Sequence, residues 1–169
     1  MNYYIISDTH FGHDKIHEFC NRPVGFEQTI LDNIARTLYC QPRGLESVVI
    51  HLGDLAWTNH DHWATDYTMV CDKAKKILVM GNHDTNSKSW YYKRGFDFVC
   101  DRIDLQIFGK DIIFTHKPVE ITNQINIHGH FHNLPEDRWE PELKSVLTPN
   151  HRLVSIEKQF SLIDLRKLI

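Results

Sequence analysis

The sequence has no excess of positive charge. Its 19 Lys and Arg residues stand against 22 Asp and Glu residues, which gives a formal net charge of −3 at pH 7. A protein dedicated to binding nucleic acid normally carries a basic surface. The charge balance therefore argues against a dedicated nucleic-acid surface and is compatible with a small substrate.

Cysteine is scarce, and its four residues lie far apart without a CxxC pair. This spacing disfavours both a disulfide framework and a cysteine-based structural zinc site. We expect reduced thiols, in the core or near the surface, at Cys20, Cys40, Cys71 and Cys100.

Long apolar runs are also lacking. No run approaches the roughly 20 residues that a membrane-spanning helix needs. The first strand pattern begins at Asn2, so the pattern of a signal peptide is not seen either. From these features we expect no membrane association and a cytoplasmic location.

The length and composition are those of a globular protein. The 169 residues suit a single domain over residues 1–169 that is large enough to bury a core. Apolar residues make up 41% and charged residues 24%, so neither disorder nor a fibrous repeat is indicated.

The first half of the sequence predicts two successive strand–helix–strand units, which imply right-handed parallel crossovers. The clearest helix signal is the spacing of Ile30, Leu31, Ile34 and Leu38. The predicted strands are Asn2–Ser7, Ser47–Leu52 and Lys76–Met80, and the predicted helices are Glu27–Tyr39, His62–Lys75 and a short one through Cys20 capped by Asp14, with a loop at Gln41–Gly44.

The second half has short apolar runs with little room for helices between them. We predict a hairpin of Asp104–Phe108 and Ile112–Thr115 around a Gly109–Asp111 turn. Further predictions are a strand at Asn126–Gly129, an antiparallel pair of Leu143–Leu147 with Leu153–Ile156, and a terminal helix capped by Ser161.

Histidine is unusually frequent, with twelve residues that gather where apolar runs end. Loops after the carboxyl ends of buried strands are where polar side chains can be held rigidly. Imidazole next to carboxylate in such loops indicates metal binding. The five segments concerned are Asp8-Thr9-His10, Gly53-Asp54, Gly81-Asn82-His83-Asp84, His116 and Gly129-His130-Phe131-His132.

In their order and spacing, these five segments resemble the motifs of the calcineurin-like metallophosphoesterases, and the small size resembles the compact bacterial or phage-type members. The resemblance implies an α/β fold, a four-layer α/β/β/α sandwich of two mixed β-sheets flanked by helices. Our reading of the strand pattern is compatible with that architecture but does not by itself select it.

The resemblance also implies a site for two divalent metal ions. By motif position, Asp8, His10 and His132 would hold one ion, Asn82, His116 and His130 would hold the other, and Asp54 would bridge them. Oxygen and imidazole ligands without thiolate suit Mn, Fe, Zn or Ni, and we expect Mn first.

The activity implied by the resemblance is hydrolysis of a phosphate ester by a metal-bridging hydroxide, with His83 and Asp54 as catalytic residues. We expect a small phosphate-ester or nucleotide-like substrate. Phosphodiesters are favoured over monoesters because no cationic clamp for a dianionic phosphate is evident. The alternative is a catalytically inactive member of the fold that serves as a scaffold for protein binding.

One segment departs from the family's protein phosphatases. Trp57 and Thr58 stand where that branch has an Asp and a phosphate-binding Arg. A protein serine/threonine phosphatase is therefore disfavoured. The carboxylate that would orient His83 is left open between Asp84 and Asp61.

Several other residues have two readings. His13 is either next to the site or a helix cap, and His128 is either a partner of the site or structural, whereas His17 and His51 are expected to be structural. Trp57, His60, His62 and Trp63 either stack on a substrate or anchor their loop to the core. The loops Leu55–Trp63 and Asn133–Pro141 are the expected rim of the site.

Overall fold

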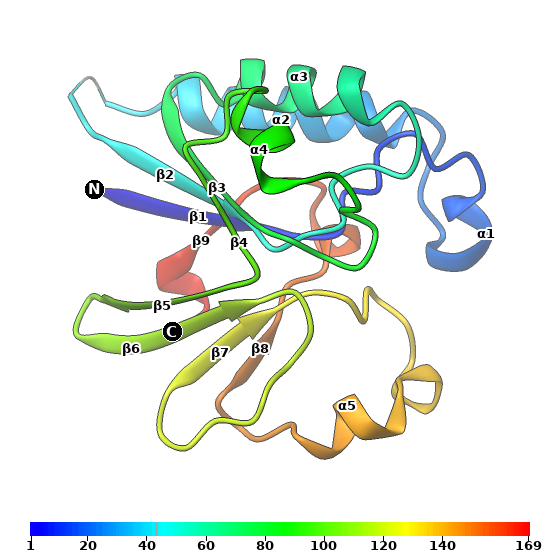
Figure 1. Cartoon of the computed structure of the whole chain (residues 1–169), viewed down its shortest axis with the longest axis vertical. Helices are drawn as coiled ribbons and strands as arrows, with labels where there is room; N and C mark the ends of the chain where they lie inside the picture. Colours follow the sequence, from blue (N-terminus) through cyan, green and yellow to red (C-terminus); the bar gives the residue numbers. More distant parts are fainter. Residues whose placement is uncertain (43) are drawn as a thin grey trace.

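Two β-sheets pack face to face, and helices flank them (Figure 1). The structure is a computed structural model that describes residues 1–42 and 44–169. The predicted loop at Gln41–Gly44 includes residue 43, which lies outside the described residues. The predicted α/β class with two mixed sheets is confirmed.

The first sheet has the strand order β4-β3-β2-β1-β9. Strands β1 to β4 run parallel, and β9 pairs antiparallel with β1, so the sheet is mixed. Its strands are β1 (Asn2–Ile6), β2 (Ser47–His51), β3 (Ala74–Val79), β4 (Phe98–Cys100) and β9 (Ile163–Asp164). The parallel pairing predicted for the first half of the chain is confirmed.

The second sheet has the order β5-β6-β7-β8. Strand β5 is antiparallel to β6, whereas β6, β7 and β8 run parallel. Its strands are β5 (Arg102–Ile107), β6 (Lys110–Thr115), β7 (Ile125–His128) and β8 (His151–Leu153).

Helices α2, α3 and α4 lie along the outer side of the first sheet, and α5 lies on the side of the second sheet (Figure 1). The helices are α1 (Ile16–Cys20), α2 (Phe26–Tyr39), α3 (His60–Val70), α4 (Lys88–Tyr92) and α5 (Pro141–Ser145). Three short 3₁₀ helices are η1 (Glu136–Arg138), η2 (Ile156–Lys158) and η3 (Leu165–Lys167).

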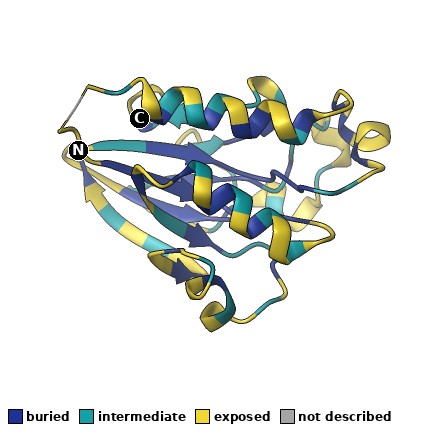
Figure 2. Cartoon of the chain, turned by 90° about the horizontal axis from the view of Figure 1, so that it is seen from above, coloured by how far each residue is buried: buried dark blue, intermediate teal, exposed yellow. Residues whose placement is uncertain are grey.

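The alternation of side chains along the strands divides the core into two layers. Tyr4 and Ile6 of β1 belong to the buried cluster that contains Ile34 of α2. Ile5, between them, belongs to the cluster that contains Ile127 of the second sheet. Figure 2 shows the strands largely dark blue and the outward sides of the helices yellow. Burial on both faces explains why the central parts of β1 and β2 are uniformly apolar.

The predicted helix at His62–Lys75 is wrong at its carboxyl end. Helix α3 stops at Val70, where the backbone N–H of Cys71 closes the last turn. Strand β3 already begins at Ala74, which pairs with Ser47 of the central strand β2. Sheet pairing and burial outweigh the high helix propensity of the alanine and lysines in this segment.

The predicted hairpin is present, but its turn is Phe108–Gly109 and not Gly109–Asp111. Lys110 already pairs with Ile107 in the ladder. The two turn residues have φ angles of 51° and 73°. A two-residue turn with positive φ at both positions matches the right-handed twist of paired strands. The phenylalanine ring also packs edge-on against Tyr3, with centroids 6.0 Å apart.

The predicted antiparallel pair near the carboxyl terminus is wrong. Leu143 lies in α5, which begins with Pro141, a residue that favours the first turn of a helix. Strand β8 covers His151–Leu153 and pairs parallel with β7.

Both predicted side-chain caps are also wrong. Helix α1 begins after Lys15 and has no side-chain cap. The terminal 3₁₀ helix is capped by Asp164, whose carboxylate accepts a hydrogen bond from the backbone N–H of Arg166. The sequence around Ser161 forms a bend before β9, so Ser161 does not begin a helix.

The four cysteines are free thiols, of which Cys40 is exposed and the others are buried. Among the residues that the structure describes, no helix combines the length and the apolar character needed to cross a bilayer.

The layer between the two sheets predicts a large effect on stability for one substitution. Ile127 has none of its surface exposed. We expect Ile127→Ala to lower the free energy of unfolding by about 2–5 kcal/mol, because it removes buried methylene groups and leaves a cavity. Urea unfolding followed by circular dichroism measures the change.

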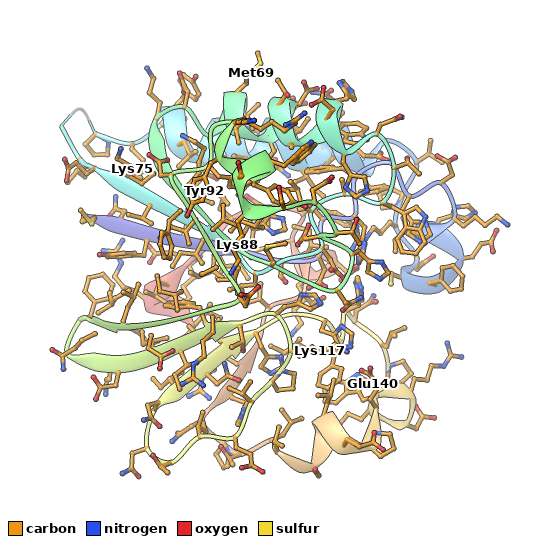
Figure 3. The ribbon with its side chains drawn as sticks, viewed as in Figure 1. Met69, Lys75, Lys88, Tyr92, Lys117 and Glu140 are labelled. Atoms are coloured by element: carbon orange, nitrogen blue, oxygen red, sulfur yellow. The ribbon has the colours of Figure 1, made fainter. Side chains whose placement is uncertain are left out.

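The control is Met69→Ala, because Met69 is 66% exposed and projects from the surface of α3 (Figure 3). Its expected effect is within about 0.5 kcal/mol. Equal effects of the two substitutions would contradict the packing of the sheets described above.

Candidate metal centre

The five motif segments follow β1, β2, β3, β6 and β7, and the structure brings their side chains together. Parallel neighbouring strands present their carboxyl ends at the same edge of a sheet. Backbone pairing continues into the first two loops, where the N–H of Asp8 donates to the carbonyl of Gly53 at 3.0 Å and that of His10 to the carbonyl of Asp54 at 2.9 Å. The second sheet is joined through the backbone N–H of His130, which donates to the Asp8 carboxylate at 3.0 Å.

The predicted ligand residues form two compact groups. Potential ligand atoms of Asp8, His10 and His132 lie within 4.8 Å of one another, and those of Asp54, His116 and His130 do the same. Asn82 adjoins the second group, because its side-chain oxygen lies 3.0 Å from Nε2 of His116. The grouping matches the division implied by the motif positions.

The Asp54 carboxylate lies between the two groups. Its Oδ2 atom is 3.5 Å from Nε2 of His10 and 3.4 Å from Nε2 of His116. Its Oδ1 atom accepts a hydrogen bond from the backbone N–H of His83 at 2.8 Å. One oxygen is therefore fixed by the protein, and the other faces both groups.

The backbone at these loops adopts conformations that residues other than glycine rarely take. Nine non-glycine residues of the described chain have positive φ, and five of them are candidate ligands. Each such conformation costs on the order of 1–3 kcal/mol and persists only where the surroundings impose it. The five are Asp8, His10, Asp54, His130 and His132.

Two glycines make room for the carboxylates. A Cβ atom on Gly81 would lie 2.1 Å from Oδ1 of Asp54, and one on Gly129 would lie 2.2 Å from Oδ2 of Asp8. Both positions therefore exclude any side chain. This explains why the Asn82 and His130 motifs each begin with glycine.

In three candidate histidines, one ring nitrogen contacts an oxygen of a residue outside the two ligand groups. Nδ1 of His116 is 2.8 Å from the carbonyl oxygen of Leu52. Nε2 of His130 is 2.6 Å from Glu140, and Nδ1 of His132 is 3.1 Å from Glu157. In each ring, a proton on the outer nitrogen leaves the other nitrogen as a lone-pair donor on the side of the site.

The electrostatics of the groups suit a bound cation. Burial raises the pKa of Asp54 to about 7, so its negative charge is costly unless a positive charge lies beside it. Burial lowers the pKa of His10 well below its usual range and also lowers that of His130, which favours the neutral form that binds metals. Nδ1 of His10 is buried and has no hydrogen-bond partner within the described chain.

His132 differs from the other candidate histidines. Burial lowers its pKa, but hydrogen bonds to Cys20 and Glu157 and the charge of Asp8 outweigh this and raise the pKa to about 10. A cation at this ring would therefore displace a proton. With this exchange, the oxygen and imidazole donors of both groups fit two divalent ions.

His83 is the most exposed of the rings that face Asp54. Its side chain is 37% exposed, and its Nε2 atom lies 3.9 Å from Oδ2 of Asp54. Burial and the nearby histidines lower its pKa. The ring can therefore reach both solvent and a molecule placed over the two groups.

Neither carboxylate considered for orienting His83 does so. Asp84 is turned inward and accepts hydrogen bonds from the backbone N–H groups of Asp54, Leu55 and Gly81 at 2.8, 3.1 and 2.8 Å. Asp61 lies on the surface of α3 and pairs with Arg94. Asp84 thus ties two motif loops together, because its two carboxylate oxygens accept hydrogen bonds from backbone N–H groups of both loops.

The aromatic loop has one rim tryptophan and one anchoring tryptophan. Trp57 is 43% exposed, stacks on His13 with centroids 4.3 Å apart, and lies 4.5 Å from the His83 ring. Trp63 stacks on the buried Phe11 at 5.3 Å. A hollow of about 440 Å³ is lined in part by His13, Trp57 and Phe19. His13 therefore lies next to the candidate site, whereas His60 and His62 lie on α3.

The other histidines lie outside the two groups. His51 is fully buried and lies 2.9 Å from the hydroxyl of Thr9. Nδ1 of His128 contacts the carbonyl of Gly129 at 3.0 Å, and its ring packs edge-on against Phe131. His17 is exposed on α1. His128 and His51 thus have packing and hydrogen-bonding roles beneath the site.

Sequence reasoning missed three charged residues that contact the candidate ligands. Arg22 pairs with Glu157, which contacts His132, and Glu140 contacts His130. Glu157 follows the last motif by 25 positions, so no local pattern connects it with His132. Cys20, His132 and Glu157 also lie within 4.8 Å of one another. The Arg22 guanidinium disfavours a cation there, since it already neutralises Glu157.

Comparisons with known proteins agree with this geometry. The family model described as calcineurin-like phosphoesterase matches residues 1–161. An uncharacterized protein of Methanocaldococcus jannaschii is 26% identical over 178 aligned positions, which cover 98% of this chain and 93% of the relative.

Two solved structures are also similar. A protein of unknown function from Aquifex aeolicus has a TM-score of 0.69 and 27% identity, covering 98% of this chain and 96% of its own. A Pseudomonas putida nuclease has a TM-score of 0.52 and 19% identity, covering 77% and 61%, so the likeness shows a shared fold.

The buried histidines beneath the site predict acid sensitivity. Burial lowers the pKa of His51 from 6.5 to about 3 and that of His128 to about 4. Below about pH 6.5 the unfolded state takes up protons that the folded state does not. The free energy of unfolding should therefore fall as the pH is lowered from about 6.5 to about 4. Urea unfolding of chelator-treated protein at several pH values should show the decline.

His51→Gln should reduce the slope of the free energy of unfolding against pH by at most about 1.4 kcal/mol per pH unit, because one of the buried imidazoles is removed. His17→Gln, at an exposed position of α1, serves as the control and should leave the slope unchanged. An unchanged slope in His51→Gln would contradict the assignment.

Proposed function

This chain belongs to the calcineurin-like phosphoesterase family, and from that premise we propose that it is a dinuclear metal-dependent phosphoesterase. The observation that carries the proposal is the convergence of two candidate ligand groups on one buried carboxylate, Asp54. The proposed substrate is a phosphate ester, with phosphodiesters favoured over monoesters.

The proposed ligands follow the two groups. One ion would be held by Asp8, His10 and His132, the other by Asn82, His116 and His130, and Asp54 would be a ligand of both. The position of Oδ2 of Asp54, within 3.5 Å of His10 and 3.4 Å of His116, supports the bridging role. The donor set suits Mn, Fe, Zn or Ni, and we place Mn first.

The chemistry follows from these assignments. When bound, the two ions neutralise phosphoryl oxygens and lower the pKa of a water, which makes hydroxide available near neutral pH. Asp54 holds its position because its Oδ1 atom accepts a hydrogen bond from the backbone N–H of His83. Its own backbone N–H donates to the carboxylate of Asp84. The protein thus orients the bridging carboxylate through two loops.

His83 is the proposed acid on the leaving-group side. Its ring is partly exposed at the mouth of the site, and its backbone is fixed to Asp54. From there it can donate a proton to the leaving oxygen or stabilise the developing charge. A positioned acid of this kind contributes about 10²–10⁴-fold in rate.

The charges around the groups support the preference for diesters. Two basic side chains contact the partners of the candidate ligands, and both are engaged by carboxylates. Arg22 pairs with the buried Glu157. Lys117 pairs with Glu140, and Figure 3 labels both side chains. A monoanionic diester needs less cationic compensation than a dianionic monoester.

The direct test is hydrolysis of aryl phosphodiesters and monoesters by chelator-stripped protein that is reloaded in turn with Mn, Fe, Ni, Zn or Mg. We expect turnover that depends on the metal and a higher kcat/KM for diesters. Asp54→Asn should abolish metal-dependent turnover, since it weakens the bridge. His83→Ala should lower kcat by about 10²–10⁴-fold while leaving the bound metal unchanged.

His17→Ala, which alters an exposed histidine on α1, is the matched control and should retain full activity. Wild-type turnover in both Asp54→Asn and His83→Ala would contradict the proposed mechanism. A protein that is inert with every metal would instead favour the alternative of a non-catalytic scaffold.

The hollow lined by Trp57, whose ring lies 4.5 Å from that of His83, supports a substrate with a planar group, such as a nucleotide-like ester. Trp57 and Phe19 are exposed at 43% and 59% and line the hollow. Trp57→Ala should raise KM about 5–100-fold for nucleotide or aryl diesters, because aromatic stacking contributes ~1–3 kcal/mol per ring. Alkyl diesters should be affected much less.

Phe98→Ala is the control, because Phe98 is similarly exposed, at 44%, on strand β4. Phe98→Ala should leave the KM for aryl diesters and the KM for alkyl diesters unchanged. Equal changes in KM for aryl and alkyl diesters in Trp57→Ala would argue against stacking in this hollow.

A further inference from the structure

A buried chain of charged contacts runs from Arg22 to His132. The guanidinium of Arg22 donates to Oε1 of Glu157 through Nε at 2.9 Å and Nη2 at 2.5 Å. The same Glu157 oxygen lies 3.1 Å from Nδ1 of His132. On the other side of the ring, Nε2 of His132 is 3.8 Å from Oδ1 of Asp8.

The chain is shielded from solvent and anchored at both ends. The side chains of Arg22 and Glu157 are 0% and 3% exposed. Arg22 also donates to the carbonyl oxygens of Asp8 and Thr9, both at 2.6 Å. Ser155 donates to the second Glu157 oxygen at 2.7 Å. Both oxygens of the carboxylate are therefore committed, and its position is fixed.

We propose that Glu157, held by Arg22, is a positioning residue for the first candidate ion. It fixes the ring of His132 so that Nε2 faces the Asp8–His10 side of the site. The proposal rests on the proposed function, because it assigns a partner to one of its ligands. It also gives Arg22 a role, since the guanidinium holds both Glu157 and the backbone that carries Asp8.

The physical reason lies in the two nitrogens of imidazole. A carboxylate that accepts the Nδ1 proton selects one tautomer, leaves the lone pair on Nε2 and makes that nitrogen a better donor to a cation. Removal of such a partner typically weakens metal binding by about 10–100-fold. The Arg22 contact keeps Glu157 from turning toward the cation, because its oxygens are already satisfied.

Glu140 offers a matched comparison within the same chain. It contacts Nε2 of His130, the other histidine of the motif, at 2.6 Å. Its side chain is 49% exposed and lies beside Lys117 at the rim (Figure 3). Glu140→Gln thus alters a carboxylate–histidine contact without disturbing the buried contacts among Arg22, Glu157 and His132.

The experiment is binding of Mn²⁺ alone to the full-length, chelator-stripped protein, measured by equilibrium dialysis and elemental analysis. We expect the wild type to bind two ions. Glu157→Gln should weaken one of them by about 10–100-fold, whereas Glu140→Gln should leave that ion unchanged. In a His132→Ala background, Glu157→Gln should produce no further loss, because its effect acts through that ring.

Additive losses in the His132→Ala background, or wild-type affinity for both ions in folded Glu157→Gln, would overturn the proposal. If Glu157→Gln does not fold, Glu157→Asp keeps a carboxylate beside Arg22 but shortens the side chain that reaches His132, and weakening of one ion supports the proposal while wild-type affinity overturns it. A wild-type chain that binds no Mn²⁺ would overturn the metal centre together with this proposal.

Discussion

The candidate site and the loops around it depend on the charge of one buried carboxylate. Asp54 is 2% exposed and lies between the two groups of candidate ligands, with Oδ2 at 3.5 Å from Nε2 of His10 and 3.4 Å from Nε2 of His116. Burial without a cation raises its pKa to about 7, so the fold holds a negative charge where water cannot solvate it. Two divalent ions would relieve this cost, so metal binding and the stability of these loops are coupled.

The loops around Asp54 are held in conformations that they would not adopt alone. Five candidate ligands have left-handed backbone angles, and together they cost several kcal/mol, at about 1–3 kcal/mol each. Buried polar contacts offset this cost. Asp84 binds three backbone N–H groups, and Arg22 binds the carbonyls of Asp8 and Thr9. These two residues are buried and stabilise the ligand loops from within the protein.

The two sheets supply different parts of the site. The first sheet carries the loops of Asp8, Asp54 and Asn82, and the second carries those of His116 and His130. The apolar layer between the sheets therefore sets the distance between the two halves of the candidate centre. Loss of packing in that layer would therefore change the distance between the candidate ligands of the two sheets.

Much of this could be predicted from the sequence because it depends on local patterns. The apolar runs that end in Asp, Asn or His predicted the parallel strands and the residues that converge at their ends. Runs of this kind are dictated by burial on both faces of a sheet, which leaves a direct mark on the sequence. The turn at Phe108–Gly109 and the end of α3 at Val70 were predicted wrongly, because strand pairing decides them.

Only the tertiary structure decided which charges support the ligands. Glu157 reaches His132, Glu140 reaches His130, and Asp84 turns inward to bind backbone N–H groups without orienting His83. Nothing in the local sequence marks Glu157, since its contact with His132 joins positions that are 25 residues apart. Contacts of this kind depend on where distant segments meet, and that follows from the packing of the whole chain.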